Sequence, residues 1–324
     1  MPAEVGAASY SRIDRDSRVY VAGHRGLVGS AIWRRLEAEG FRRLIGATSA
    51  ELDLRDRDKT FAFFAEQRPE VVIDAAARVG GILANRDHPT EFLSDNLRIQ
   101  VNVMDAALEV RTPRLLFLGS SCIYPKYADQ PIRESSLLTG ELEPTNDAYA
   151  IAKIAGIMHV QAVRRQHGLR WISAMPTNLY GPNDNFDLTS SHVLPALIRR
   201  FHDAKAEGTS EVVLWGTGTP QREFLHVDDL ADASLHLLEH YDEPGPINVG
   251  VGTDVTIREL AETIARVVGY TGAIGIDPSK PDGTPRKLLD VSRLGALGWK
   301  PGIDLEDGVA GVYAWYLDHR REDR

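Results

Sequence analysis

Residues 18–29, Arg-Val-Tyr-Val-Ala followed by Gly-His-Arg-Gly-Leu-Val-Gly, are the stretch that decides the fold. Arg18–Ala22 is a short β-rich run, and after the glycines a helical pattern continues to Glu39 and is closed by Gly40. In a strand, glycine loop and helix of this kind, backbone N–H groups can approach a pyrophosphate at the helix N-terminus. The spacing is G-x-x-G-x-x-G rather than G-x-G-x-x-G, and a simple tight turn is the alternative. We predict a dinucleotide-binding loop here.

Further apolar runs repeat this alternation of strands and helices along the chain. A helical pattern covers Asp95–Val110, and strands are expected at Arg43–Ala47, Val71–Ala77, Leu115–Gly119 and Arg170–Met175. The βαβαβ order predicts an α/β protein with a Rossmann-type doubly wound parallel sheet and a smaller α/β substrate domain. We expect a flexible tail over residues 1–17 and a cofactor domain over 18–180, to which 222–250 returns. Residues 181–221 and 251–324 would form the substrate domain.

The end of the second expected strand bears on which dinucleotide is bound. A site for NAD usually places an acidic residue about 20 residues after the glycines, where it binds the ribose 2′-hydroxyl. Here the chain reads Ala-Thr-Ser-Ala at residues 47–50, with no acid before Glu51. Arg25 or Arg43 could instead face a 2′-phosphate, although an exposed loop is also an ordinary place for Arg25. The pattern favours NADP.

Polar side chains follow the buried run Leu115–Gly119, at the edge of the sheet where ligands bind in open α/β folds. Ser120 and Cys122, the chain's single thiol, stand here. In a later helical stretch, Tyr149 and Lys153 are spaced i, i+4 and share one helix face. An adjacent cation lowers the pKa of a tyrosine. The alternative is that this pair has no function and lies on the edge of an amphipathic helix.

Composition limits the possible functions of the 324-residue chain. Its hydrophobic content of 43% and charged content of 26% are ordinary for a globular protein, and its net charge of −9 argues against an extended nucleic-acid-binding surface. No run approaches the roughly 20 apolar residues that span a membrane, and residues 1–17 do not resemble a secretory signal. One cysteine fits a reducing compartment, so we expect a cytoplasmic protein. A phosphorylated substrate would need a local basic cluster.

The glycine loop, Ser120, Tyr149 and Lys153 together resemble the extended short-chain dehydrogenase/reductases. Within that group the chain is similar to the GDP-L-fucose synthase family from Val19 to about Tyr316. Six stretches carry this resemblance: GSSCIYPK at 119–126, EPTN at 143–146, PTNLYGP at 176–182, SHVLPAL at 191–197, REFLHVDD at 222–229 and KPDGTPRK at 280–287.

The resemblance implies a 3,5-epimerase and 4-reductase that converts GDP-4-keto-6-deoxy-D-mannose to GDP-L-fucose with NADPH. A 4-ketone acidifies the protons at C3 and C5, and each inversion needs one group that removes a proton and another that returns one. Intrinsic pKa values of about 8.5 and 6.5 suit Cys122 and His192 to this exchange, and the resemblance implies that Cys122 is the base and His192 the acid. The alternatives are that Cys122 is a buried, inert thiol and that His192 only stands at the start of a helix. For the reduction, the resemblance makes Tyr149 the proton donor, Ser120 its partner at the sugar oxygen, and Lys153 a ligand of the nicotinamide ribose.

The resemblance also assigns binding residues. Arg200, Trp215, Arg222 and Asp282 would contact the nucleotide-sugar and supply the local basic cluster that a diphosphate requires. The residues implied to line NADP(H) are Gly23, His24, Arg25, Gly26, Leu27, Val28, Gly29, Asp53, Leu54, Leu118, Gly119, Ser120, Ser121, Lys153, Pro176, Thr177, Asn178, Leu179 and His192. No metal ligands are expected.

Two other functions are compatible with the same fold. A nucleotide-sugar 4-epimerase or 4,6-dehydratase would retain its nicotinamide, but dehydratases carry a Thr-Asp-Glu set where this chain has Ser-Cys-Ile at 121–123. A non-catalytic NADP-sensing protein usually lacks the tyrosine or the lysine, and both are present here. The family further implies a homodimer formed through helices that include Asp95–Val110 and Ala148–Gln166.

Overall fold

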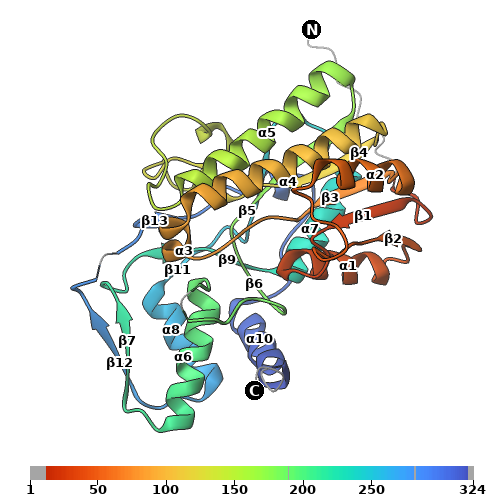
Figure 1. Ribbon diagram of the computed structural model, residues 1–324. Coiled ribbons are helices and arrows are strands. Elements are labelled where there is room, and N and C mark those ends of the chain that lie inside the picture. Colours follow the sequence, from red (N-terminus) through yellow and green to blue (C-terminus); the bar gives the residue numbers. More distant parts are fainter. Residues whose placement is uncertain (1–11, 189, 281, 320–324) are drawn as a thin grey trace.

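The computed structural model describes residues 12–188, 190–280 and 282–319. Its centre is a parallel sheet of six strands in the order β10-β5-β4-β3-β1-β2 (Figure 1). The chain runs outward from β1 to β2 and then returns to β3 on the other side of β1, so the strand order reverses between β1 and β3. Ligands of doubly wound sheets bind at the carboxyl ends of the strands at such a reversal. The strands are β1 (Arg18–Ala22), β2 (Arg43–Ile45), β3 (Val71–Asp74), β4 (Arg114–Leu118), β5 (Arg170–Pro176) and β10 (Ile247–Val249).

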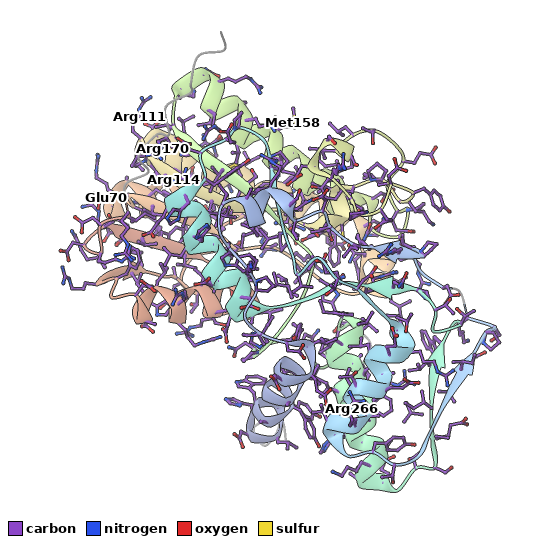
Figure 2. All side chains as sticks on the ribbon, turned by 180° about the vertical axis from the view of Figure 1, so that it is seen from behind. Glu70, Arg111, Arg114, Met158, Arg170 and Arg266 are labelled. Atoms are coloured by element: carbon purple, nitrogen blue, oxygen red, sulfur yellow. The ribbon has the colours of Figure 1, made fainter. Side chains whose placement is uncertain are left out.

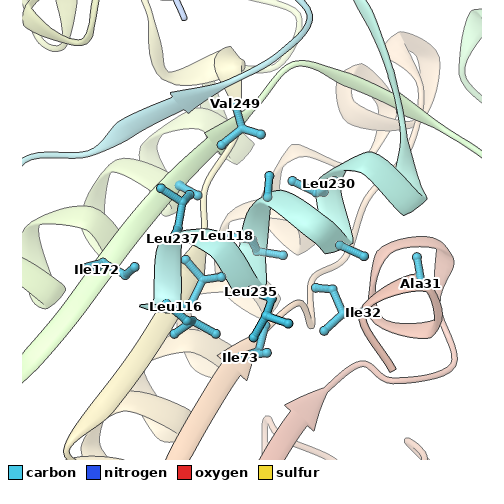
Figure 3. Close-up of a cluster of buried hydrophobic side chains, with 14 of the residues drawn as sticks. Ala31, Ile32, Ile73, Leu116, Leu118, Ile172, Leu230, Leu235, Leu237 and Val249 are labelled. Carbon is cyan, nitrogen blue, oxygen red and sulfur yellow. The ribbon is translucent and has the colours of Figure 1, made fainter. Parts of the chain in front are cut away.

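Helices cover both faces of this sheet, which confirms the predicted fold class. On one face α7 (Val227–His240) packs beside α1 (Leu27–Ala38). Figure 3 shows Leu230, Leu235 and Leu237 of α7 among apolar side chains of the strands, such as Leu116 and Ile172. These side chains are almost completely buried, and each such leucine contributes about 2 kcal/mol through removal of apolar surface from water. The sheet is therefore a rigid platform for the residues at its edge.

The opposite face carries α2 (Arg57–Gln67), α4 (Pro89–Glu109) and α5 (Asp147–His167), with Phe64, Val103 and Ile157 in the core. Helix α4 begins at Pro89, six residues before the predicted start at residue 95. Proline at the first helical turn lacks only an N–H that has no partner within the helix, so it starts a helix without loss. Asn96 stands inside α4 and is buried, where its amide binds Arg78 and the carbonyl of Phe92.

A smaller lobe lies below the sheet in Figure 1. It consists of the helices α6 (Val193–Glu207), α8 (Ile257–Val268) and α10 (Leu305–His319) and of the parallel strands β7 (Glu211–Trp215) and β12 (Ala273–Asp277). Phe201, Leu260 and Val309 fill its core. Thr256 and Glu259 form a capping box that fixes the start of α8.

Short strands connect the two lobes. β8 (Gln221–Arg222) pairs with β11 (Val255–Thr256) and with β13 (Arg286–Lys287), and β6 (Asn178–Tyr180) pairs with β9 (Phe224–His226). The remaining elements are α3 (Ile82–Asp87), α9 (Ser292–Ala296) and the 3-10 turns at Ser121–Ile123 and Glu134–Ser136.

The domain boundaries stay a prediction. Residues 222–250 supply β10 to the main sheet and α7 to its face, and 181–221 supply α6 and β7 to the smaller lobe. Of the tail expected over residues 1–17, residues 1–11 lie outside the described residues. Arg15 pairs with Glu239 at 2.6 Å and with Glu39 at 3.3 Å. No helix among the described residues is long and apolar enough to cross a membrane.

Candidate active site

The glycine loop forms a close-packed cradle at the carboxyl end of β1. A Cβ added to Gly29 would lie 2.1 Å from the carbonyl oxygen of Gly23, and Gly23 itself has a φ of +75°. Helix α1 has Gly26 at its N-cap with no side-chain cap and no acidic residue in its first turn. Its first N–H groups are thus available to an anion. The loop residues from His24 to Val28 lie in this cradle, which fits the pyrophosphate of a dinucleotide.

Arg25 and the turn after β2 are where the sequence predicts the adenine end of the coenzyme. Arg25 is exposed, whereas the Glu51 carboxylate accepts bonds from the backbone N–H and the hydroxyl of Thr48, both at 2.8 Å. Those bonds lower the pKa of Glu51, and the charge of Arg25 adds to the effect. Asp53 is held by Arg55 in a bidentate ion pair, and Leu54 is buried. The nearest acid is therefore already partnered, and Arg25 is available to a phosphate.

Ser120 links the two halves of the expected chemistry. Its hydroxyl accepts a bond from the backbone N–H of Cys122 at 3.2 Å, and it lies close enough to the Cys122 thiol and the Tyr149 phenol to act toward lowering the pKa of each. Gly119, just before it, has no room for a side chain, because a Cβ there would lie 2.5 Å from the sulfur of Met175. The structure thus brings Ser120, Cys122 and Tyr149 together at the end of β4, beside the buried Leu118 and Ser121.

The effect of Lys153 on the pKa of Tyr149 differs from the prediction. Its ammonium donates to the carbonyl of Leu118 at 2.9 Å and lies 5.9 Å from the centroid of the Tyr149 ring. Burial raises the pKa of Tyr149, which does not fall below its ordinary value as expected from the adjacent cation. Burial also lowers the pKa of Lys153 to about 8, against the opposing charge of Asp74. The phenol therefore stays protonated at neutral pH.

Asp74 is a buried carboxylate that sequence reasoning missed. It ends β3, is 0% exposed, and neither carboxylate oxygen has a hydrogen-bond partner in the part of the chain that the structure describes. Burial raises its pKa to about 6, while the charge of Lys153 acts in the opposite direction. The only signal in the sequence is an acid among apolar and small residues at the end of a strand.

Two side chains that sequence reasoning did not select lie against the Cys122 thiol. Asn146 Nδ2 is 3.3 Å from Sγ, and Lys287 Nζ is 3.4 Å from it. Burial acts to raise the pKa of Cys122, but Lys287, Ser120 and Asn146 outweigh it and hold that pKa below its ordinary value. Lys287 lies within the sequence motif at 280–287, whereas its neighbour Arg286 is paired with Asp254 at 2.6 Å.

His192 comes from the smaller lobe, where it stands at the N-cap of α6. More than a third of its surface is exposed, yet the surrounding protein atoms lower its pKa. The segment before it is fixed to the coenzyme side, because Gly81 N–H donates to the carbonyl of Ser190 at 3.0 Å. A Cβ at Gly81 would lie 2.8 Å from the carbonyl oxygen of Ser191.

Of the four expected substrate residues, Arg200 lies on α6, Trp215 on β7, Arg222 on β8 and Asp282 in the loop after β12; we call these four residues the strip. Arg200 donates to the carbonyl of Val213, two residues before the exposed Trp215. Asp282 is not free, because its carboxylate accepts bonds from the backbone and hydroxyl of Thr217. Arg222 links the strip to the main site, because its charge interacts with that of Cys122.

The turn after β5 is held by a second buried acid that sequence reasoning missed. Thr177 and Asn178 both donate to the backbone carbonyl of Glu223, at 3.3 and 2.8 Å. The Glu223 side chain is 0% exposed and accepts bonds from the N–H groups of Val251 and Gly252, both at 2.7 Å. Glu223 thus fixes the segment that begins at Pro176 and contains Leu179.

The sheet, the glycine cradle and the Ser-Tyr-Lys cluster define an NAD(P)-dependent enzyme of the Rossmann class. The model of the NAD dependent epimerase/dehydratase family matches residues 19–250, and the chain belongs to that family.

Particular relatives are more informative. The chain is 58% identical over 317 residues to GDP-L-fucose synthase 1 of Arabidopsis thaliana, covering 98% of each chain. It is 55% identical over 312 residues to GDP-L-fucose synthase of Escherichia coli (strain K12), covering 94% of this chain and 97% of that one. A crystal structure of a GDP-L-fucose synthetase from Naegleria fowleri bound to NADP has a TM-score of 0.90 at 29% identity, covering 97% of this chain and 96% of the other. The resemblance predicted from the sequence motifs is confirmed.

Proposed function

We propose that this protein is a GDP-L-fucose synthase. It inverts C3 and C5 of GDP-4-keto-6-deoxy-D-mannose and then reduces the 4-ketone with NADPH. The similarity to GDP-L-fucose synthases over nearly the whole chain supports the substrate. The observation that carries the mechanism is that Ser120, which accepts a bond from the Cys122 backbone at 3.2 Å, also interacts with the Cys122 thiol and the Tyr149 phenol. One carbonyl oxygen bound at Ser120 would thus be next to a base and to a proton donor.

In the epimerase half, Cys122 removes the proton next to the ketone. Lys287 and Asn146 stabilise the thiolate that this step requires. His192 returns a proton to the other face, since it comes from the opposite lobe. Its exposure lets it take up a proton from solvent.

In the reductase half, Tyr149 donates its phenolic proton to O4. The raised pKa keeps the phenol protonated at neutral pH, so the proton is present when the step begins. The bound NADPH supplies the hydride. The Lys153 ammonium, which donates to the carbonyl of Leu118, would bind the nicotinamide ribose. Arg25 would hold the 2′-phosphate, because it is exposed beside a turn whose acid is already bonded.

GDP would lie along the strip of the smaller lobe. Arg200 and Arg222 offer guanidinium groups to the diphosphate, the arrangement best suited to phosphate oxygens. Trp215, with 63% of its surface exposed, offers an aromatic face to the base. Asp282 orders the turn at Thr217 beside Trp215, so we expect it to act on the nucleotide through that turn.

We further propose that the protein is a cytoplasmic homodimer. The single cysteine supports the compartment. Exposed apolar side chains on α4 and α5, namely Val101, Ile151 and Met158, support an interface on those helices. Figure 2 shows Met158 on α5 from behind.

The deciding experiment supplies GDP-4-keto-6-deoxy-D-mannose and NADPH and identifies the product sugar by NMR. We expect NADPH consumption and GDP-L-fucose. An absence of NADPH consumption would exclude the proposal and favour an enzyme that retains its nicotinamide.

The division of labour is tested in deuterated water. Cys122→Ser should slow deuterium entry at C3 and C5 at least tenfold while NADPH affinity stays within about twofold, because the thiol is the base. Tyr149→Phe should block reduction but leave measurable exchange. Equal loss of exchange in both variants contradicts the separate roles.

A further inference from the structure

The proposed reaction, on which this inference rests, leaves one proton in the wrong place. After the first inversion Cys122 carries the proton that it removed, and His192 has lost the one that it gave. The second inversion again needs a thiolate at Cys122 and a protonated His192. His192 is exposed and can regain its proton from solvent. Cys122 faces a bound substrate on the side of Ser120 and needs another exit.

A small cavity beside the thiol offers that exit. Its volume is about 10 Å³, the space of about one water molecule. Cys122 and Lys287 line it together with Glu143 and Lys126; its other lining residues are Tyr124, Pro125, Ile132, Thr284 and Arg286. A water needs polar partners, and the thiol, the carboxylate and the two ammonium groups provide them.

Glu143 connects this cavity with the surface of the protein. Its Oε2 lies 3.1 Å from Lys126 Nζ and accepts a bond from the Thr284 hydroxyl at 3.1 Å, while Oε1 accepts from the hydroxyl of Thr145 at 3.3 Å. The exposed fractions of the Glu143 and Lys126 side chains are 18% and 28%, so the carboxylate touches both the cavity and bulk water. It is the acid that lines the cavity.

We propose that Glu143 and a water in this cavity carry the proton of Cys122 to solvent between the two inversions. The S–H bond breaks and the thiolate forms again beside Lys287. The proton passes to the water, from the water to the Glu143 carboxylate, and from there to bulk buffer. His192 takes one proton from solvent, so the site returns to its starting charge. No electron is transferred, and Glu143 does not touch the substrate.

The ratio of doubly to singly inverted product tests this relay, because a site that is not reset performs only one inversion. Glu143→Gln keeps the size of the side chain and removes its basicity. In deuterated water with excess NADPH, each inverted carbon carries deuterium, and NMR of the reduced product counts them. We expect at least a tenfold fall in the ratio of doubly to singly inverted sugar, with the rate of the first inversion within about twofold of wild type. Glu141→Gln, an exposed acid nearby, is the matched control.

Chemical rescue separates a relay from a structural role. Formate or acetate added to Glu143→Ala should restore the ratio in proportion to its concentration, because a small carboxylate can occupy the vacated space. A wild-type ratio in Glu143→Gln, or equal slowing of both inversions without rescue, overturns the relay. If the wild-type protein makes no fucose at all, it is the proposed function that fails.

Discussion

At the scale of single residues, Lys287 controls the reactivity of Cys122. Lys287→Met removes the main attractive charge, so the burial of the thiol dominates and its pKa rises. We expect the pH at which iodoacetamide alkylation of the thiol is half-maximal to rise by about one pH unit or more. Deuterium exchange at pH 7 should slow about tenfold.

The control for this change is Lys205→Met, because Lys205 donates to the carbonyl of Val268 in the smaller lobe. An unchanged alkylation profile in Lys287→Met would show that the contact of 3.4 Å does not stabilise the thiolate.

Asp74 makes a separate prediction about stability. Its pKa in the folded state is about 6, above the ordinary value of 3.8, so the folded protein binds this proton more tightly than the unfolded chain does. Its contribution to stability is complete below pH 4 and is lost as pH rises through 6. About 2 pKa units correspond to about 3 kcal/mol. Relative to wild type, Asp74→Asn should therefore gain up to about 3 kcal/mol in free energy of unfolding between pH 4 and pH 6.5.

Urea unfolding of both proteins across this pH range measures the effect, and other carboxyl groups cancel in the comparison. A difference between the two proteins that does not change with pH would show that Asp74 keeps an ordinary pKa.

At the scale of elements, the loop at Gly80 and Gly81 positions His192. Gly81→Ala places a Cβ 2.8 Å from the carbonyl oxygen of Ser191, a contact that a real side chain does not make, so the segment leading to His192 must move. We expect a loss of C3 and C5 exchange of tenfold or more, while NADPH affinity changes less than twofold. Gly245→Ala, where a Cβ meets nothing within 4 Å, is the control. Equal loss of exchange and coenzyme binding would contradict a role in placing His192.

These elements also show what sequence could predict. The strand Arg18–Ala22 is followed by a glycine loop, and the strand Arg114–Leu118 is part of an apolar run. The positions of both strands and of the residues after them could therefore be predicted from the sequence. β8 and β13 have two residues each, too short for any periodicity. Their pairing nevertheless brings Lys287 to Cys122, 165 residues away along the chain. A contact of this kind depends on how the two lobes meet, and local sequence carries no information about that.

At the scale of the whole molecule, an acidic protein binds a diphosphate substrate. The net charge of −9 repels such a ligand at long range, and the arginines of the strip act only nearby. Salt reduces the long-range repulsion and the local attraction together. The basic groups near Cys122 each contact a neighbouring residue: Lys287 contacts the Cys122 sulfur, and Lys126 contacts Glu143. The net charge of the chain does not reveal such local contacts, so composition alone could not indicate the site.

The proposed dimer is tested on the same scale. Ile151 and Met158 on α5 have exposed fractions of 47% and 41% and are two helical turns apart, so they lie on one face. Ile151 also stands between Tyr149 and Lys153, so an interface there would hold the catalytic helix in place. Ile151→Lys combined with Met158→Lys should give a monomer by light scattering, because two like-charged pairs would face each other. Leu138→Lys, an exposed loop residue, should remain dimeric. A wild-type monomer at micromolar concentration, or a double variant that stays dimeric, contradicts this interface.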